Sequence, residues 1–170
     1  MILVVSMHYH LCCGPQKILP GWINVDREKF GQEVVADINK PWSFSKPGSA
    51  EYILIEDGLE HVESLEHFLE SASRILKVGG TLEIQVPHFK NPSAYRFTHR
   101  HFFSHSMFTI FLEPHDRVQD LRVTKIHLLV DKRFPLSLLD IFANAFPAIW
   151  ERFFYVSGIR VWLTKTGNNA

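Results

Sequence analysis

Two neighbouring segments near the N-terminus carry residue types that could hold a nucleotide-like ligand. The first, Tyr9–Gln16, is an apolar run that ends in the small residues Cys12 and Gly14, and the second, Leu19–Asp26, closes on a carboxylate. In α/β sheets, a turn of small residues lets backbone N–H groups approach the ligand, and an acid that ends the next strand accepts the ribose hydroxyls. The two segments therefore predict a binding turn at Gly14 and a ribose acceptor at Asp26.

Histidines form the second set of residues that could do chemistry. The chain has ten, and imidazole is the side chain best suited to take up a proton near neutral pH. The histidines at 61, 88, 99 and 101 follow two predicted strands, at the ends where open sheets place ligands. We expect His61 or His88 to be the catalytic base, whereas the alternative for each histidine is a structural or surface role.

Metal binding is not expected from these histidines. His8 and His10 with Cys12, or His99 and His101 with His105, match no standard zinc spacing. The only cysteines, Cys12 and Cys13, are adjacent, so no disulfide framework is expected and a reducing cytoplasm fits. At the end of a buried strand they are predicted to behave as small apolar residues.

The hydrophobic pattern predicts the elements that must position these groups. Ser64 is the expected N-cap of a helix that ends at Lys77 and is stopped by Gly79-Gly80. A second helical region covers 136–154 with a break near Pro147, and loops cover 39–48 and most of 88–107. Strand and helix alternate through residue 86, which favours a mostly parallel sheet. The predicted strands are 2–12, 22–26, 33–37, 51–56, 81–86, 123–131 and 158–165.

Length and composition limit the class of protein. We expect one domain over residues 1–170, because 46% of the residues are apolar and 14 are Phe. Eighteen basic residues balance eighteen acidic ones, which argues against a nucleic-acid binder. No stretch reaches the length of a membrane-spanning helix, and the apolar run 2–5 is too short for a signal peptide.

Several motifs, in order, resemble the class I S-adenosylmethionine-dependent methyltransferases, in particular small bacterial-type ones. The resemblance covers roughly Tyr9 to Phe103. It rests on Cys12-Cys-Gly-Pro15, Pro20-Gly-Trp-Ile-Asn-Val-Asp26, Val35-Ala-Asp-Ile38, Glu56-Asp-Gly-Leu-Glu-His61, Ile75-Leu-Lys-Val-Gly-Gly-Thr-Leu82, Val86-Pro-His88 and His99-Arg-His-Phe-Phe-Ser104.

The resemblance implies a fold, a cofactor and a set of binding residues. The fold is a Rossmann-like, mostly parallel seven-stranded sheet with helices on both faces and an antiparallel C-terminal hairpin. S-adenosylmethionine is the implied cofactor. The resemblance also implies that Asp37 lies near the adenine amine of the cofactor, and that Glu56 or Asp57 lies near its methionine half. The implied cofactor-binding residues are Cys12, Gly14, Pro15, Asp26, Asp37, Ile38, Glu56 and Asp57.

The chain departs from the family pattern at Cys12 and Gln16, where relatives carry glycine, and it lacks the N-terminal helices that often form a lid. The leading hypothesis is a methyltransferase acting on a small-molecule or glycan-type acceptor. The alternative is a catalytically silent relative that serves as a binding partner or scaffold. A nicotinamide-dependent oxidoreductase is disfavoured because the chain has no G-x-G-x-x-G.

The Phe-rich segment 134–154 leaves several interpretations open. Its aromatic residues include Phe134, Phe142, Phe146, Phe153 and Phe154. Core packing of the last helix is the first expectation. A dimer surface or a membrane-facing surface is the alternative, and a homodimer is plausible.

Overall fold

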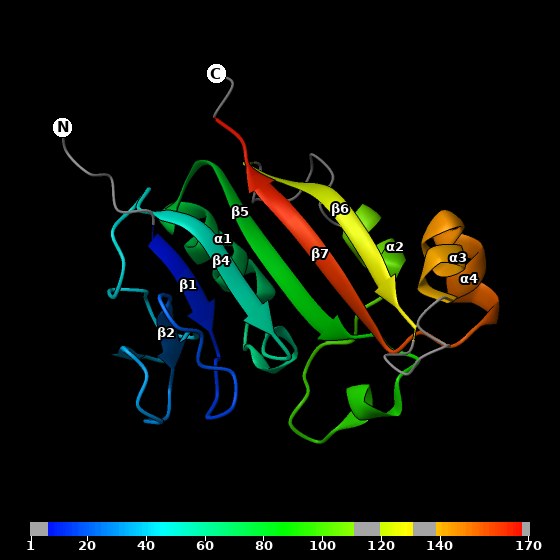
Figure 1. Ribbon diagram of the computed structural model, residues 1–170, viewed down its shortest axis with the longest axis horizontal. Helices are drawn as coiled ribbons and strands as arrows, with labels where there is room; N and C mark the ends of the chain where they lie inside the picture. Colours follow the sequence, from blue (N-terminus) through cyan, green and yellow to red (C-terminus); the bar gives the residue numbers. More distant parts are fainter. Residues whose placement is uncertain (1–6, 111–119, 131–138, 168–170) are drawn as a thin grey trace.

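The computed structural model describes residues 7–110, 120–130 and 139–167, and its centre is a seven-stranded sheet in the order β3-β2-β1-β4-β5-β7-β6 (Figure 1). The pairs β1–β2, β1–β4, β2–β3 and β4–β5 are parallel, whereas β7 pairs antiparallel with both β5 and β6. The predicted mixed sheet and its C-terminal hairpin are confirmed. The strands are β1 Met7–Leu11, β2 Ile23–Asp26, β3 Val34–Val35, β4 Ala50–Glu56, β5 Leu76–Pro87, β6 Leu121–Leu129 and β7 Gly158–Lys165.

These bounds fall inside or close to the predicted strands. Residues 2–6 of the first predicted strand and residue 131 of the sixth lie outside the described residues. The short link between the first two strands predicts a single helical turn at Gln16–Leu19, but the structure has no helix there. The strand predicted over 33–37 shortens to Val34–Val35.

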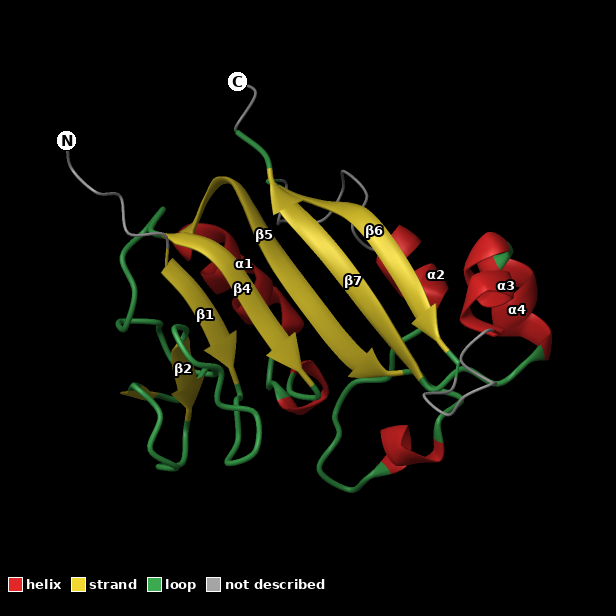
Figure 2. Ribbon diagram, viewed as in Figure 1, coloured by secondary structure: helices red, strands yellow, loops and turns green. Residues whose placement is uncertain are grey.

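The helices are short, and Figure 2 shows how they are placed around the sheet. The helix α1 begins as predicted, since the Ser64 side chain accepts a hydrogen bond from the His67 N–H at 3.1 Å. It ends at Ile75, earlier than expected, and the next residue already pairs in β5. The helices are α1 Leu65–Ile75, α2 His105–Ile110, α3 Leu139–Ala145 and α4 Pro147–Phe153, with single 3₁₀ turns η1 Leu59–His61 and η2 Pro92–Tyr95.

The prediction that Gly79-Gly80 stops the helix is therefore wrong; the glycine pair forms an irregularity inside β5. Gly79 has φ +81°, and a Cβ on Gly80 would lie 2.9 Å from the Lys77 carbonyl oxygen. The register between β4 and β5 shifts at this point, between Ala50 and Tyr52. Only glycine fits such a bulge, which explains why the pair occurs here rather than at the helix end.

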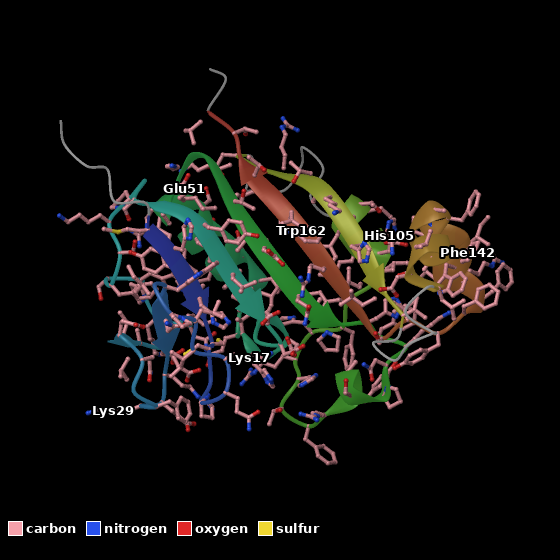
Figure 3. All side chains as sticks on the ribbon, viewed as in Figure 1. Lys17, Lys29, Glu51, His105, Phe142 and Trp162 are labelled. Atoms are coloured by element: carbon pink, nitrogen blue, oxygen red, sulfur yellow. The ribbon has the colours of Figure 1, made fainter. Side chains whose placement is uncertain are left out.

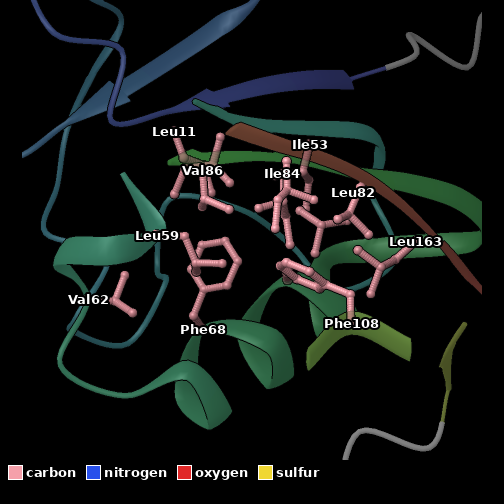
Figure 4. Close-up of a cluster of buried hydrophobic side chains, with 14 of the residues drawn as sticks. Leu11, Ile53, Leu59, Val62, Phe68, Leu82, Ile84, Val86, Phe108 and Leu163 are labelled. Carbon is pink, nitrogen blue, oxygen red and sulfur yellow. The ribbon is translucent and has the colours of Figure 1, made fainter. Parts of the chain in front are cut away.

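The two faces of the sheet differ in polarity. On β7, Arg160 and Trp162 alternate with the buried Val161 and Leu163 (Trp162 is labelled in Figure 3). Figure 4 shows Leu163 beside Phe108 of α2, and Phe68 of α1 beside Leu59 in the same cluster, so the helices cover the apolar face. Both aromatic side chains are almost fully buried.

The opposite face carries a polar network instead of helices. Arg160 lies 3.3 Å from Glu83 and 3.5 Å from Glu56, and the Tyr52 hydroxyl donates to Glu83. In Figure 1, α1 and α2 lie behind the sheet and α3 and α4 lie beyond β6. Helices were expected on both faces; among the described residues, α1 and α2 cover one face, while α3 and α4 lie beside the edge strand β6. The reason is local: the links from β1 to β4 contain no α-helix that could cross the other face.

The segment α3–α4 packs against the outer strand β6. The Asn144 side chain accepts from the Leu128 N–H at 2.7 Å and donates to the Leu128 carbonyl at 2.9 Å, and Asp140 accepts from the Val130 N–H at 2.7 Å. Ala143 is buried and Trp150 is partly buried. These contacts hold one side of the helix pair on the sheet.

The expectation that the phenylalanines of this segment form core is wrong for the described ones. Phe142, Phe146, Phe153 and Phe154 are 50–69% exposed, while Phe134 lies outside the described residues. The helices are short: α3 contacts β6 and α4 contacts α2, and no further described element covers their outer side. Across the described residues, no helix combines the length and the apolar character that a membrane crossing requires.

The packing of α1 gives a stability prediction. Ile75 is fully buried in α1, whereas Ile110 in α2 is 64% exposed. Ile75→Ala should lower the free energy of unfolding by about 2–5 kcal/mol, through lost burial and a residual cavity. The matched change Ile110→Ala should stay within about 0.5 kcal/mol. Urea denaturation followed by circular dichroism measures both, and equal costs would contradict the assigned core.

Candidate functional site

A cleft of about 690 Å³ lies where the carboxyl ends of β1, β2, β3 and β4 meet. Parallel neighbouring strands deliver their last residues to the same edge, which brings together groups far apart in sequence. Six of the eight predicted cofactor residues line this cleft: Cys12, Gly14, Asp26, Asp37, Ile38 and Asp57.

Asp26 fixes the turn that follows β1. Its Oδ2 accepts the Gly14 N–H at 2.9 Å, and its Oδ1 accepts the Glu28 N–H at 3.0 Å. The Cys13 N–H donates to the Val25 carbonyl at 3.3 Å, which ties the same turn to β2. Asp26 therefore caps the turn. Each carboxylate oxygen has a second lone pair, so the capping leaves acceptor capacity for ligand hydroxyls.

Asp37 forms an Asx turn just beyond β3. Its Oδ1 accepts both the backbone N–H and the side-chain amide of Asn39, at 2.9 and 3.0 Å. Its Oδ2 receives no hydrogen bond from the described residues and lies in the wall of the cleft. Ile38 is buried beside it, and its carbonyl accepts the Trp42 indole N–H at 2.9 Å. The arrangement offers one rigid acceptor oxygen next to an apolar wall.

Cys12 adopts a backbone conformation that glycine would adopt without cost. Its φ is +53°, a value shared among non-glycine described residues only by Asp57, also in the cleft. Such conformations cost about 1–3 kcal/mol each and cluster at functional sites. Burial, with the nearby Asp26 and Glu60 carboxylates, raises the pKa of Cys12 to about 12, so its thiol stays protonated and unreactive near neutral pH.

Gly58 makes room for the Cys12 side chain. A Cβ on Gly58 would lie 2.8 Å from the Cys12 Cβ and 3.1 Å from its sulfur. Glycine is absent at position 12, and a glycine at the facing position 58 supplies the missing space. The turn is therefore built around the cysteine rather than distorted by it.

The other two predicted cofactor residues lie outside the lining of this cleft. Pro15 is exposed on the turn, and Glu56 points to the polar face of the sheet, where it approaches Arg160. Asp57, one residue later, is in the cleft and pairs with Lys17 at 2.9 Å. Both members of that ion pair are about half exposed, so the pair contributes little to stability and can open.

The structure separates the two predicted catalytic histidines. His61 lines the cleft, and its Nδ1 lies 3.0 Å from the Thr98 carbonyl oxygen. His88 is fully buried outside the cleft, 2.8 Å from Glu151, and its Nδ1 accepts the Lys90 N–H at 3.1 Å. Burial lowers the pKa of His88, which favours a neutral ring that donates through Nε2. His88 thereby ties the end of β5 to α4.

His99 and His101 lie near His61 on the segment that follows η2. The His61 and His99 ring centroids are 4.6 Å apart, edge to face. His101 lies 2.8 Å from the Val62 carbonyl through its Nε2. Neither His99 nor His101 lines the cleft itself.

Sequence reasoning missed the residues on the far wall of the cleft. Phe97, Thr98 and Arg100 line it, and Phe97 is fully exposed. The Arg100 N–H donates to the Glu60 carbonyl at 2.8 Å, which holds this segment against η1. The motif that begins at His99 was the available signal, but it has no periodicity that would predict which side chains face the cleft.

A scan of protein-family models and a search of curated protein sequences give no match to this chain. Solved structures do match. A SAM-dependent methyltransferase from Archaeoglobus fulgidus superposes with a TM-score of 0.68 at 15% identity, over 94% of this chain and 86% of that one. A chain of the complex between the Haloferax volcanii Trm112 methyltransferase activator and a methyltransferase gives 0.68 at 14% identity, over 97% and 84%.

A third neighbour is the geranyl diphosphate C-methyltransferase of Streptomyces coelicolor, solved with Mg²⁺, geranyl diphosphate and S-adenosyl-L-homocysteine. Its TM-score is 0.62 at 12% identity, over 95% of this chain and 72% of that one. The chain therefore has the fold of the S-adenosylmethionine-dependent methyltransferases, as its motifs predicted. At these identities, the likeness establishes the fold alone.

The contact between Cys12 and Gly58 can be tested by a double-mutant cycle. Gly58→Ala should destabilise the protein by about 1–3 kcal/mol, because the new Cβ overlaps the Cys12 side chain. In a Cys12→Gly background the same change should cost at least about 1 kcal/mol less, as a coupling between touching residues. Chemical denaturation of the four proteins measures the coupling, and an equal cost in both backgrounds would refute it.

His10 gives the site a pH-dependent stability. It lies on β1 just before the turn, fully buried, and neither ring nitrogen has a hydrogen-bond partner among the described residues. Burial lowers the pKa of His10 below its ordinary 6.5. Below about pH 6.5, His10 is therefore protonated more readily in the unfolded chain than in the folded one. The protein keeps its full stability above this pH and loses stability as the pH falls below it.

We therefore expect the thermal unfolding temperature to decrease when the pH is lowered from about 7.5 to about 5.5. The decrease should be smaller in His10→Leu. Part of the loss should remain in that variant, because burial also lowers the pKa of His88 and His99. His67→Leu is the matched control, since His67 is only partly buried, on α1. An unchanged pH dependence in His10→Leu would remove His10 as a cause.

Proposed function

We propose that this chain is an S-adenosylmethionine-dependent methyltransferase that binds its cofactor in the cleft at the carboxyl ends of β1 to β4. The observation that carries the proposal is convergence: Gly14, Asp26 and Asp37, predicted from separate motifs, line one cleft in a methyltransferase fold. In this proposal the Asp26 carboxylate accepts the ribose hydroxyls, the turn at Gly14 contacts the cofactor through its backbone, and Asp37 accepts from the adenine amine.

In methyl transfer, the main task of the protein is to align the acceptor with the methyl group of the cofactor. The sulfonium cofactor supplies both the methyl group and the leaving group, and the acceptor attacks the methyl carbon in a direct displacement. A base is needed where the acceptor must lose a proton. His61 is the proposed acceptor-side residue, because it lines the cleft, whereas the buried His88 is assigned the role of positioning the end of β5.

We propose a small-molecule or glycan-type acceptor. The zero formal net charge gives no excess of cations for a phosphate-rich polymer, and the exposed ring of Phe97 offers an apolar surface at the cleft wall. Arg100 beside it would suit an acceptor that carries an acidic group. The two unpaired cysteines fit a cytoplasmic location, which is likewise a proposal.

The alternative function is a catalytically silent scaffold. It would follow if the cysteine in the binding turn prevented the cofactor from approaching. The packing of Cys12 against Gly58 speaks against this, since Gly58 leaves space for the side chain and the Gly14 N–H still reaches Asp26. The binding experiment below separates the two hypotheses.

Calorimetric titration with S-adenosylmethionine and S-adenosylhomocysteine tests the proposed function. Asp26→Ala should weaken binding by about 10- to 100-fold, which corresponds to about 1.5–3 kcal/mol for hydrogen bonds to a charged group. Glu70→Ala is the control, because Glu70 is exposed on α1 and does not line this cleft. Binding by Cys12→Gly but not by the native chain would favour the scaffold, and binding by neither would overturn the cofactor assignment.

We also propose that the exposed side of α3–α4 mediates self-association as a homodimer. Phe142, Phe146, Ile149 and Phe153 are 58–69% exposed, a larger apolar surface than isolated side chains would give. Light scattering of the purified chain should report a dimer, and the double variant Phe142→Ser/Phe153→Ser a monomer. A monomeric native chain would contradict the assignment and leave this surface for another protein, as in the Haloferax volcanii complex with an activator.

A further inference from the structure

Three side chains beside the cleft converge from separate segments. Glu60 and His61 lie on η1, and His99 lies on the segment after η2. Each offers one ligand atom, and these atoms all lie within 4.8 Å of one another. We propose that Glu60, His61 and His99 form a binding site for a divalent transition metal, and that Zn²⁺ is the ion it fits best. This inference goes beyond the proposed function and does not depend on it.

Each of the two histidines contacts a backbone carbonyl through one ring nitrogen, which leaves the other nitrogen for a ligand. The Nδ1 of His61 lies 3.0 Å from the Thr98 carbonyl, and the Nδ1 of His99 lies 3.1 Å from the Ala94 carbonyl. A carbonyl only accepts, so in each ring the proton sits on Nδ1 and the lone pair sits on Nε2. A backbone acceptor that fixes the tautomer and aims the other nitrogen at the ion is the usual outer-shell arrangement.

Glu60 supplies an independent observation. The residue is only 1% exposed, and its Oε2 has no hydrogen-bond partner among the described residues. A buried carboxylate oxygen without a partner is costly, and such groups in native proteins call for an explanation. A cation bound to the Glu60 carboxylate would offset that cost. The structure thus contains a buried carboxylate with an unpartnered oxygen in the same group as two histidines.

The backbone holds the two segments together without the ion. The N–H groups of Arg100 and His101 both point at the Glu60 carbonyl, at 2.8 and 3.4 Å. Around zinc at about 2.0–2.1 Å, tetrahedral ligand atoms lie about 3.3 Å apart, so ligand atoms that now lie within 4.8 Å of one another must approach by up to about 1.5 Å. His61 is exposed and can make that movement by rotation about its side-chain bonds.

The donor set selects the class of ion. Two imidazoles and one carboxylate form the ligand set of catalytic zinc sites, in which a further position stays open for water or substrate. Mg²⁺ and Ca²⁺ prefer oxygen ligands throughout, so they are poor candidates. His61 belongs both to this group and to the cleft wall, so the ion would lie on the acceptor side. There it could coordinate an acceptor oxygen and lower its pKa, and His61 would then act as ligand rather than base.

Zinc titration of chelator-treated protein tests the site. Native chain should bind one ion per molecule, and His61→Ala, His99→Ala and Glu60→Gln should each weaken binding by at least about tenfold. His67→Ala is the matched control, because its ring lies on α1 against the Lys40 carbonyl and outside the group. Circular dichroism confirms that each variant is folded; His61→Ala is the most informative, since an exposed side chain can be removed without loss of the fold.

Cobalt substitution tests the ligand set on the native chain, without any mutation. Co²⁺ in the proposed site should give the visible bands of low coordination and lack the near-ultraviolet absorption of a thiolate ligand. A thiolate band would move the site to Cys12 or Cys13 and overturn the proposal. So would an absence of binding, or equal binding by the native chain and His61→Ala. The titration contains no cofactor, so its outcome is separate from that of the S-adenosylmethionine experiment.

Discussion

One hydrogen bond sets the geometry of the cleft, the 2.9 Å contact between the Gly14 N–H and the Asp26 carboxylate. It joins Gly14, in the turn after β1, to Asp26, the last residue of β2, and it holds this turn without a crossover helix. A charged acceptor strengthens such a bond, and its position at the edge of a parallel sheet leaves the other lone pairs directed at the cleft. Asp37 follows β3 and Asp57 follows β4, and these strands pair with β2 and β1, so both acids are brought to the same cleft.

The residues around this turn combine two left-handed backbone conformations with space for the Cys12 side chain. Cys12 and Asp57 both adopt left-handed backbone conformations, and they face each other across the start of the cleft. Gly58 receives the side chain that the family pattern would not place at position 12. A change that looks damaging when the motif is compared alone is therefore accommodated by a neighbour in space. Sequence motifs read singly cannot reveal such a compensation, because the two residues are far apart in the chain.

Much of the fold could be predicted because strand ends and turns carry local signals. The acids at 26, 37 and 57 each follow a short apolar run, and topology then brings them together. The rest depended on contacts that no local pattern encodes. Glu56 and Asp57 are neighbours in sequence, but Glu56 ends β4 and lies on the polar face, whereas Asp57 follows the strand with φ +53° and lies in the cleft. His88 resembles a catalytic base in sequence, but the fold buries it against Glu151, from the C-terminal helix pair, outside the cleft.

The edges of the sheet constrain how this protein can meet others. At one side β3 is only Val34–Val35, and at the other the Asn144 amide occupies the outer hydrogen-bonding groups of Leu128 on β6. The rest of β6 carries the exposed cations Arg122 and Lys125. Short, capped and charged borders deter the addition of a foreign strand. Recognition must then run through side chains on surfaces, which favours selective contacts and protects the chain from open-ended strand-to-strand polymerisation.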